Sequence, residues 1–175
     1  ASTIMTSSLD VPKTFNRFVT ELKKIVDINW ATIVLTDNDG IHFLAMFSDH
    51  DSPWKIHESM PLKGTATEWV VLHKKPLVES DVLQESQFVT AELYRQQGIR
   101  SIANLPLLIK TRTIGSLIVA SRQADTYGPK QTIFLKQLAN QIAMPIENSR
   151  LFAGAREQAR IDELTGLFNR RSLDE

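Results

Sequence analysis

The sequence predicts an α+β fold, with a central antiparallel β-sheet flanked by helices and a long helix at each end of the chain. Apolar residues recur at helical steps of three and four near both ends, between residues 10 and 28 and between residues 130 and 160. Short runs rich in β-branched residues lie between these segments. Two pairs of runs are joined by connections too short for a parallel crossover, so those pairs are expected to be antiparallel.

The first helix is predicted from about Asp10 to Ile28, after an N-terminal tail of residues 1–9. Asp10 is a suitable N-cap, and Pro12 is tolerated in a first turn. The apolar stripe consists of Val11, Phe15, Phe18, Leu22 and Ile25. This spacing suits a helix packed on the core, and equally a helix paired with a second copy, because it also matches a coiled-coil seam.

A first hairpin follows this helix. Strands Trp30–Thr36 and Ile41–Phe47 are predicted on either side of the turn Asp37–Gly40, whose residues tolerate positive φ. Side chains alternate along a strand, so residues 41, 43, 45 and 47 are expected on one face and residues 42, 44 and 46 on the other.

The polar loop after this hairpin contains Asp49-His50-Asp51, and His57 follows. Carboxylates with histidines suit several metals. The spacing matches no closed metal site, however, so we predict a solvated loop here and no metal.

Two short helices are predicted in the middle of the chain. Residues 65–68, Thr-Ala-Thr-Glu, form a capping box that opens a helix ending before Pro76. Leu77 and Val78 form a brief extended piece. A second short helix, through Phe88 and Tyr94, is expected to stop at Gly98.

A second hairpin is the clearest in the sequence. Residues 101–109 and 114–121 are both apolar and are joined by the turn 110–113. Pro106 within the first of these strands indicates a strand end, an edge or a bulge.

The last helix is predicted from Lys130 to about Arg160, longer than one small domain requires. Pro145 is expected to kink it. Residues 153–161 are small and charged, as is typical of a helix that leaves its domain, and we interpret them as a helical linker. The apolar set is Phe134, Leu135, Leu138, Ile142, Ile146, Leu151 and Phe152.

Composition excludes several classes of function. Lys plus Arg equals Asp plus Glu at 20 each, whereas a nucleic-acid binder would carry a basic excess. The chain has no cysteine, which excludes disulfides, thiolate zinc sites and cysteine nucleophiles and fits a cytoplasmic location. No run is long enough to span a membrane. No convincing pair of nucleophile and base is present, so no catalytic residue is assigned and the chain is not expected to be an enzyme.

Several segments between residues 64 and 152 follow a recognisable order. They are Thr65–Leu77, Ser80-Asp81, Phe88, Gly98–Ile102, Leu105–Leu107, Ile114–Val119, Leu138–Ala143 and Ile146–Phe152. In this order they resemble a GAF domain, and the helix and hairpin before residue 50 fit the same profilin-like or PAS-like fold. We interpret residues 10–152 as a GAF sensory domain.

GAF domains commonly hold a small molecule between the sheet and the adjacent layer of helices and loops. The resemblance implies a pocket lined by Trp54, His57, Glu68, Trp69, Asp81, Phe88, Tyr94 and Asn104. The alternative is that the aromatic members simply fill the core. The ligand is unknown. Because the chain has no cysteine, it cannot bind a bilin covalently, nor act as the free methionine-sulfoxide reductases of this fold do through their thiols.

A sharper motif lies near the end of the chain. Residues 162–171, Asp-Glu-Leu-Thr-Gly-Leu-Phe-Asn-Arg-Arg, resemble the entry motif of GGDEF domains, which make cyclic dimeric GMP from two GTP molecules. No Gly-Gly-Asp/Glu-Glu-Phe run is present. We therefore interpret residues 162–175 as the truncated start of a GGDEF domain and expect no cyclase activity in this chain.

Two hypotheses of function follow. In the first, a ligand changes the arrangement of the terminal helices in a homodimer and so controls the linked GGDEF domain. In the second, the pocket is filled by its own side chains and the module is a ligand-free dimerisation scaffold. Both expect a seam formed by Phe15, Phe18, Leu22, Leu138, Ile142 and Ile146.

Overall fold

The computed structural model describes residues 11–38 and 40–174, and the side chains of these residues as far as Leu151. The predicted tail, residues 1–9, and the predicted cap Asp10 lie outside the described residues. So do the side chains of the GGDEF-like motif at 162–171.

Both predicted hairpins form, and they join through their inner strands into one sheet of six antiparallel strands in the order β3-β2-β1-β6-β5-β4. The strands are β1 (Trp30–Asp37), β2 (Gly40–Ser48), β3 (Ser59–Met60), β4 (Leu77–Glu79), β5 (Ser101–Ile109) and β6 (Arg112–Ser121). The predicted α+β class with a central antiparallel sheet is confirmed.

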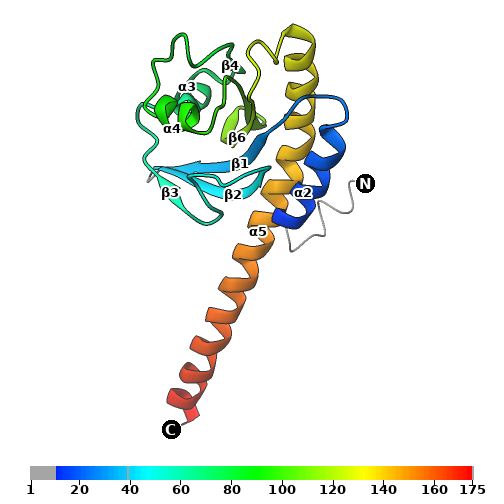
Figure 1. Ribbon diagram of the computed structural model, residues 1–175. Helices are drawn as coiled ribbons and strands as arrows, with labels where there is room; N and C mark the ends of the chain where they lie inside the picture. Colours follow the sequence, from blue (N-terminus) through cyan, green and yellow to red (C-terminus); the bar gives the residue numbers. More distant parts are fainter. Residues whose placement is uncertain (1–10, 39, 175) are drawn as a thin grey trace.

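Helices lie on both faces of this sheet (Figure 1). The terminal helices α2 (Val11–Leu22) and α5 (Pro129–Asp174) pack on one face and share its apolar core. The short helices α3 (Ala66–His73) and α4 (Ala91–Gln96) lie on the other face, where a second core forms. Because side chains alternate along each strand, the same strands supply both cores.

Two β-bulges change this alternation. In β2, Phe43 pairs with Val34 and Ala45 with Ile33, so Leu44 is an extra residue. Ile41 and Phe43 consequently face the α3 and α4 side, whereas Ala45 and Phe47 face the terminal helices. The prediction that residues 41, 43, 45 and 47 share a face is therefore wrong. A second bulge, at Ile114 in β6, turns that side chain toward the terminal helices.

Pro106 and Gly115 explain local features of the β5–β6 hairpin. The pairing of β4 with β5 ends at Asn104, so Pro106 needs no N–H for a neighbour on that side. At Gly115 an added Cβ would lie 1.9 Å from the main-chain oxygen of Val34. Only glycine allows β6 to approach β1 this closely.

Helix α2 is shorter than predicted. It ends at Leu22, and its buried side chains are Val11, Phe15, Val19 and Leu22. The turn after it leaves Ile25 73% exposed, so Ile25 does not belong to the stripe.

Helix α5 is longer than predicted: it spans 46 residues and runs past the sheet well beyond the domain (Figure 1). At 1.5 Å per residue this is about 70 Å. Pro145 does not end the helix, and it continues through the predicted boundaries at residues 153 and 162 because no second proline interrupts a segment rich in helix formers. In the part of the chain that the structure describes, no helix has the length and hydrophobicity to span a bilayer.

Candidate functional site

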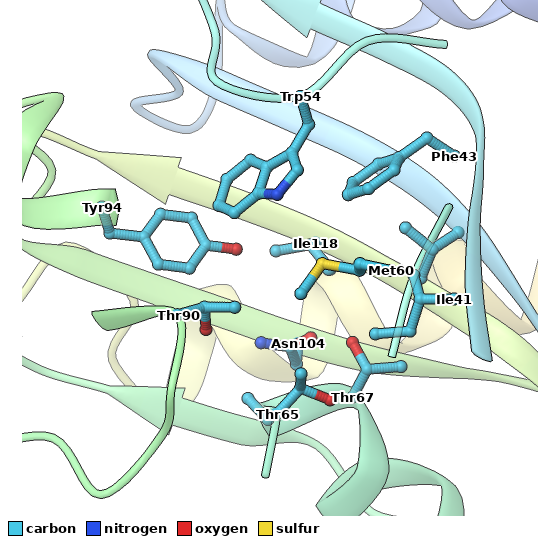
Figure 2. Close-up of a pocket in the computed structure, with 12 residues that line it drawn as sticks. Ile41, Phe43, Trp54, Met60, Thr65, Thr67, Thr90, Tyr94, Asn104 and Ile118 are labelled. Carbon is cyan, nitrogen blue, oxygen red and sulfur yellow. The ribbon is translucent and has the colours of Figure 1, made fainter. Parts of the chain in front are cut away.

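A small enclosed cavity lies between the sheet and the layer that contains α3 and α4 (Figure 2). Strands β1, β2, β5 and β6 form its floor, and β3 and the start of α3 form one wall. The volume is about 20 Å³, enough for a water molecule but not for a metabolite. Its lining residues are Val34, Ile41, Phe43, Trp54, Met60, Thr65, Ala66, Thr67, Thr90, Tyr94, Asn104 and Ile118.

Aromatic rings close one side of the cavity. The Trp54 ring centroid lies 5.2 Å from that of Tyr94, 5.4 Å from Trp30 and 5.8 Å from Phe43. The Trp30 indole N–H donates to the Ser52 hydroxyl at 3.1 Å. Contacts of this kind stabilise the rings against one another, so in this state the aromatic side chains fill the core.

Four polar side chains line the cavity, and each has a polar atom that bonds to no other described residue. Thr67, Thr90, Tyr94 and Asn104 are only 3, 9, 8 and 2% exposed. The Asn104 Oδ1 accepts from the Ser116 hydroxyl at 3.3 Å, but its amide nitrogen has no partner among the described residues. The three hydroxyl groups likewise donate to no described residue. Figure 2 shows the Tyr94 hydroxyl and the Asn104 carboxamide beside the Met60 thioether.

The cavity is electrically neutral. Its lining contains no Asp, Glu, Lys, Arg or His. Burial, reinforced by the negative charge of Glu79, raises the pKa of Tyr94 well above its ordinary value, so its hydroxyl stays protonated and can donate.

Helix α3 begins at this cavity because of the predicted capping box. The Glu68 N–H donates to the Thr65 hydroxyl at 3.2 Å. The Glu68 carboxylate accepts from the Gly64 N–H at 3.2 Å, one residue earlier than in the usual reciprocal arrangement. This acidic side chain in the first turn also offsets the positive end of the helix dipole.

Three of the eight predicted pocket residues line the cavity, namely Trp54, Tyr94 and Asn104. The others do not. Glu68 caps its helix, and Trp69 stacks on His73 with ring centroids 4.1 Å apart. His57 is exposed on the loop before β3.

Asp81 and Phe88 belong to a separate open groove beside β4, with a volume of about 620 Å³. Asp81 forms an ion pair with Arg100, and hydrogen bonds from that guanidinium lower the pKa of Asp81. The eight predicted pocket residues are therefore divided between the cavity, this groove and positions outside both.

The predicted dimer seam falls largely inside the chain's own core. Phe15, Leu22, Ile142 and Ile146 are buried against the sheet, and Phe18 and Leu138 are partly buried beside them. Of the two interpretations of the first helix, the core-packing one describes its side chains Phe15 and Leu22. Among the described side chains of α5, the exposed large apolar ones are Ile133, Met144 and Leu151.

The loop with histidine and carboxylates is used for ion pairing. Asp49 contacts the Arg122 guanidinium at 2.9 Å, accepts from Asn29 at 2.9 Å and lies against His50. Burial alone would raise the pKa of Asp49, but these hydrogen bonds outweigh burial and hold the pKa well below its ordinary value. Among the described residues there is no group of three or more metal-ligating side chains.

A buried carboxylate links the sheet to α5. The side chain of Glu147 is 4% exposed. It accepts from Arg112, at the tip of the β5–β6 hairpin, at 2.8 Å, and from Arg150 Nε at 2.8 Å. We call these three residues the Glu147 clamp.

The GAF domain model matches residues 10–146, more than half of the chain. The chain belongs to the GAF domain family. GAF domains serve as sensory and regulatory modules in signalling proteins. No curated protein matches this GAF chain.

Solved structures share the GAF fold at low sequence identity. The GAF domain of a two-component sensor histidine kinase from Bacillus halodurans is 17% identical, with a TM-score of 0.73 over 83% of this chain and 99% of that one. The GAF region of a putative membrane protein from Geobacter sulfurreducens is 22% identical, with a TM-score of 0.68 over 82% and 97%. A free methionine-R-sulfoxide reductase from Neisseria meningitidis is 18% identical, with a TM-score of 0.67 over 86% of each chain.

Sequence reasoning missed Thr67 and the strand side chains of the cavity other than Asn104. The capping box located the start of α3, but only packing decides which side of α3 faces the sheet. The bulge at Leu44 brings Ile41 and Phe43 into the cavity, and no sequence signal marked that bulge.

Proposed function

We propose that this GAF domain is a ligand-controlled, dimeric regulatory module of a cytoplasmic, bacterial-type signalling protein. A small molecule enters the cavity, and its binding changes how the α5 helices of two copies lie against each other. The energy for this change is the difference in the ligand's affinity for the two arrangements.

The observation that carries this proposal is that β5 and β6 serve the cavity and α5 at once. Asn104 and Ile118 line the cavity, whereas Leu105, Leu107 and Leu117 belong to the core shared with α5. A shift of these strands at the cavity therefore acts directly on the surface that supports α5.

The Glu147 clamp is a second link between β6 and α5. Arg112 at the hairpin tip holds Glu147, just before α5 runs beyond the sheet (Figure 1). A clamp at this point sets the angle at which the free part of the helix leaves the domain.

We place the dimer contact on the outer face of α5 instead of the predicted seam. Ile133, Met144 and Leu151 are 60, 47 and 55% exposed and lie at intervals of eleven and seven residues, which suit a helix pair. Figure 1 shows α5 continuing past the end of the sheet as a single helix. A single helix in water is only marginally stable, so a second copy of α5 is the natural partner.

The resemblance of residues 162–171 to the GGDEF entry motif supports a GGDEF domain as the output. Making cyclic dimeric GMP joins two GTP molecules, so two output domains must meet, and a helix pair can control this. The coding sequence after residue 175 tests this part. A Gly-Gly-Asp/Glu-Glu-Phe loop within roughly a hundred residues supports it, and another type of domain refutes it.

A regulatory role is favoured over an enzymatic one. Some structures with this fold are free methionine-R-sulfoxide reductases. Those enzymes act through cysteine thiols, and this chain has no cysteine. The cavity contains no other nucleophile beside a base.

The ligand-free dimerisation scaffold is the second candidate. The volume of about 20 Å³ and the packed rings of Trp30, Trp54 and Tyr94 favour it. Ligand binding is favoured by Thr67, Thr90, Tyr94 and Asn104, because each presents to the cavity a polar atom that bonds to no other described residue.

Spin labels on Asn148→Cys can measure the distance between the α5 helices of two copies, since the chain has no other cysteine. Met60→Trp fills the cavity, and Leu72→Trp adds the same bulk on the exposed side of α3 as a control. We expect Met60→Trp, but not Leu72→Trp, to shift the distance between the labels. A monomer at tens of micromolar, or a dimer with an unchanged distance, would refute ligand control through α5.

A further inference from the structure

The lining of the cavity restricts the chemistry of its occupant. Uncompensated charge is costly to bury, and no charged side chain faces the space. The start of α3 contributes positive potential to the lining, and the Glu68 carboxylate already offsets it. The nearest charge acting on Tyr94 is that of Glu79, which opposes an anion there.

The polar groups of the cavity are chiefly donors. The Asn104 amide nitrogen is a donor only, and the oxygen of the same carboxamide already accepts from Ser116. The Tyr94 hydroxyl, which bonds to no other described residue, lines the same cavity (Figure 2). Two buried donors can hydrogen-bond a carbonyl oxygen of a ligand, but they do not stabilise a cation.

The remaining walls are apolar and partly aromatic. Phe43 and Trp54 stack with an interplanar angle of 23°, and Ile41 and Ile118 complete the lining. Such walls accept a flat ring. The cavity is too small for a ring unless a lining side chain moves. Met60 is the side chain best placed to do so, because it lies on the two-residue edge strand β3 and methionine side chains adapt readily.

We infer that the cavity takes an uncharged aromatic molecule bearing a carbonyl oxygen, held by Asn104 and Tyr94 after the Met60 side chain moves aside. This inference rests on the proposed ligand-binding function and names the class of ligand. Thr67 and Thr90 supply two further hydroxyl groups for polar substituents on the ring.

Benzamide, benzoate and benzamidinium test this inference, because they share one ring and differ in charge. Binding is measured by NMR on the ¹⁵N-labelled chain at millimolar concentrations, since ligands with so few atoms bind weakly. Wild type is compared with Met60→Ala, which opens the cavity, and with Leu72→Ala, which removes an exposed apolar side chain from α3.

We expect benzamide to bind Met60→Ala at least about tenfold more tightly than either charged probe, and to perturb the amides of Thr67 and Thr90. Asn104→Leu should remove this preference. Tyr94→Phe is the milder second variant if Asn104→Leu fails to fold, and it should weaken benzamide because it removes the other donor to the carbonyl oxygen.

Two results would overturn the inference, and they differ in meaning. Equal or tighter binding of benzoate or benzamidinium in the cavity refutes the uncharged class but leaves a ligand-binding module. Failure of all three probes to bind Met60→Ala refutes both the class and the ligand-controlled function, and it leaves the scaffold.

Discussion

The Glu147 clamp gives a strong test of how α5 is held. Arg112 and Arg150 are 63 and 46% exposed, whereas the Glu147 carboxylate between them is 4% exposed. Each arginine therefore contributes little by itself, about 1 kcal/mol after screening by solvent. Either one is enough to keep the buried carboxylate paired.

Removing both arginines has a different consequence. In Arg112→Met with Arg150→Met, the carboxylate of Glu147 is buried with no partner, which costs about 3–5 kcal/mol. The double variant should therefore lose about 1–3 kcal/mol more than the sum of the two single variants. Adding Glu147→Gln to the double variant should restore most of this loss, because no charge then remains to be buried.

Urea unfolding measures each free energy, and hydrogen exchange on residues 143–151 reports whether α5 loosens locally. Strictly additive losses, or a triple variant no more stable than the double, would show that Glu147 is hydrated or paired elsewhere. In that case the clamp could not set the exit angle of α5.

Three further predictions follow. Gly115→Ala should destabilise the fold by several kcal/mol in thermal unfolding, because its Cβ would meet a main-chain oxygen at 1.9 Å; Gly128→Ala, whose Cβ meets only a flexible side chain at 3.2 Å, should differ little. The folded-state pKa of Asp49 is lowered, so its stabilisation is complete above about pH 4 and is lost as pH falls through the folded pKa; Asp49→Asn should reduce this acid-induced loss of Tm. Met144→Lys with Leu151→Lys should convert the dimer to a monomer in sedimentation and make Tm independent of protein concentration, and a dimer that persists would place the contact elsewhere.

The sequence predicted the local elements of this GAF domain well. Short connections are nearly sufficient to specify an antiparallel hairpin, so both hairpins and their turns were found. The capping box at Thr65 and the stop at Gly98, with φ of 77°, are local signals and were also found. Boundaries were less certain: α2 ends earlier and α5 later than predicted, because helix ends depend on what the helix packs against.

The site was predicted only in part. Trp54, Tyr94 and Asn104 were identified through the resemblance to GAF domains and do meet at one cavity. Asp81 and Phe88 come from the same stretch of chain but face another groove. Sequence order brings residues near the site, and the direction of each side chain depends on loop geometry that no local pattern encodes.

What the sequence determined by itself was the class of fold, the order of its elements and the absence of thiol chemistry. These follow from periodicity, turn residues and composition, which act over short distances along the chain. Only the tertiary structure decided which face each side chain occupies. A single bulge at Leu44 places Phe43 in the cavity. Packing on the sheet buries Ile142 and Ile146, which were predicted to lie in the dimer seam. Helical and strand patterns specify that a residue is buried, but the partner that buries it is chosen by contacts between segments far apart in the sequence.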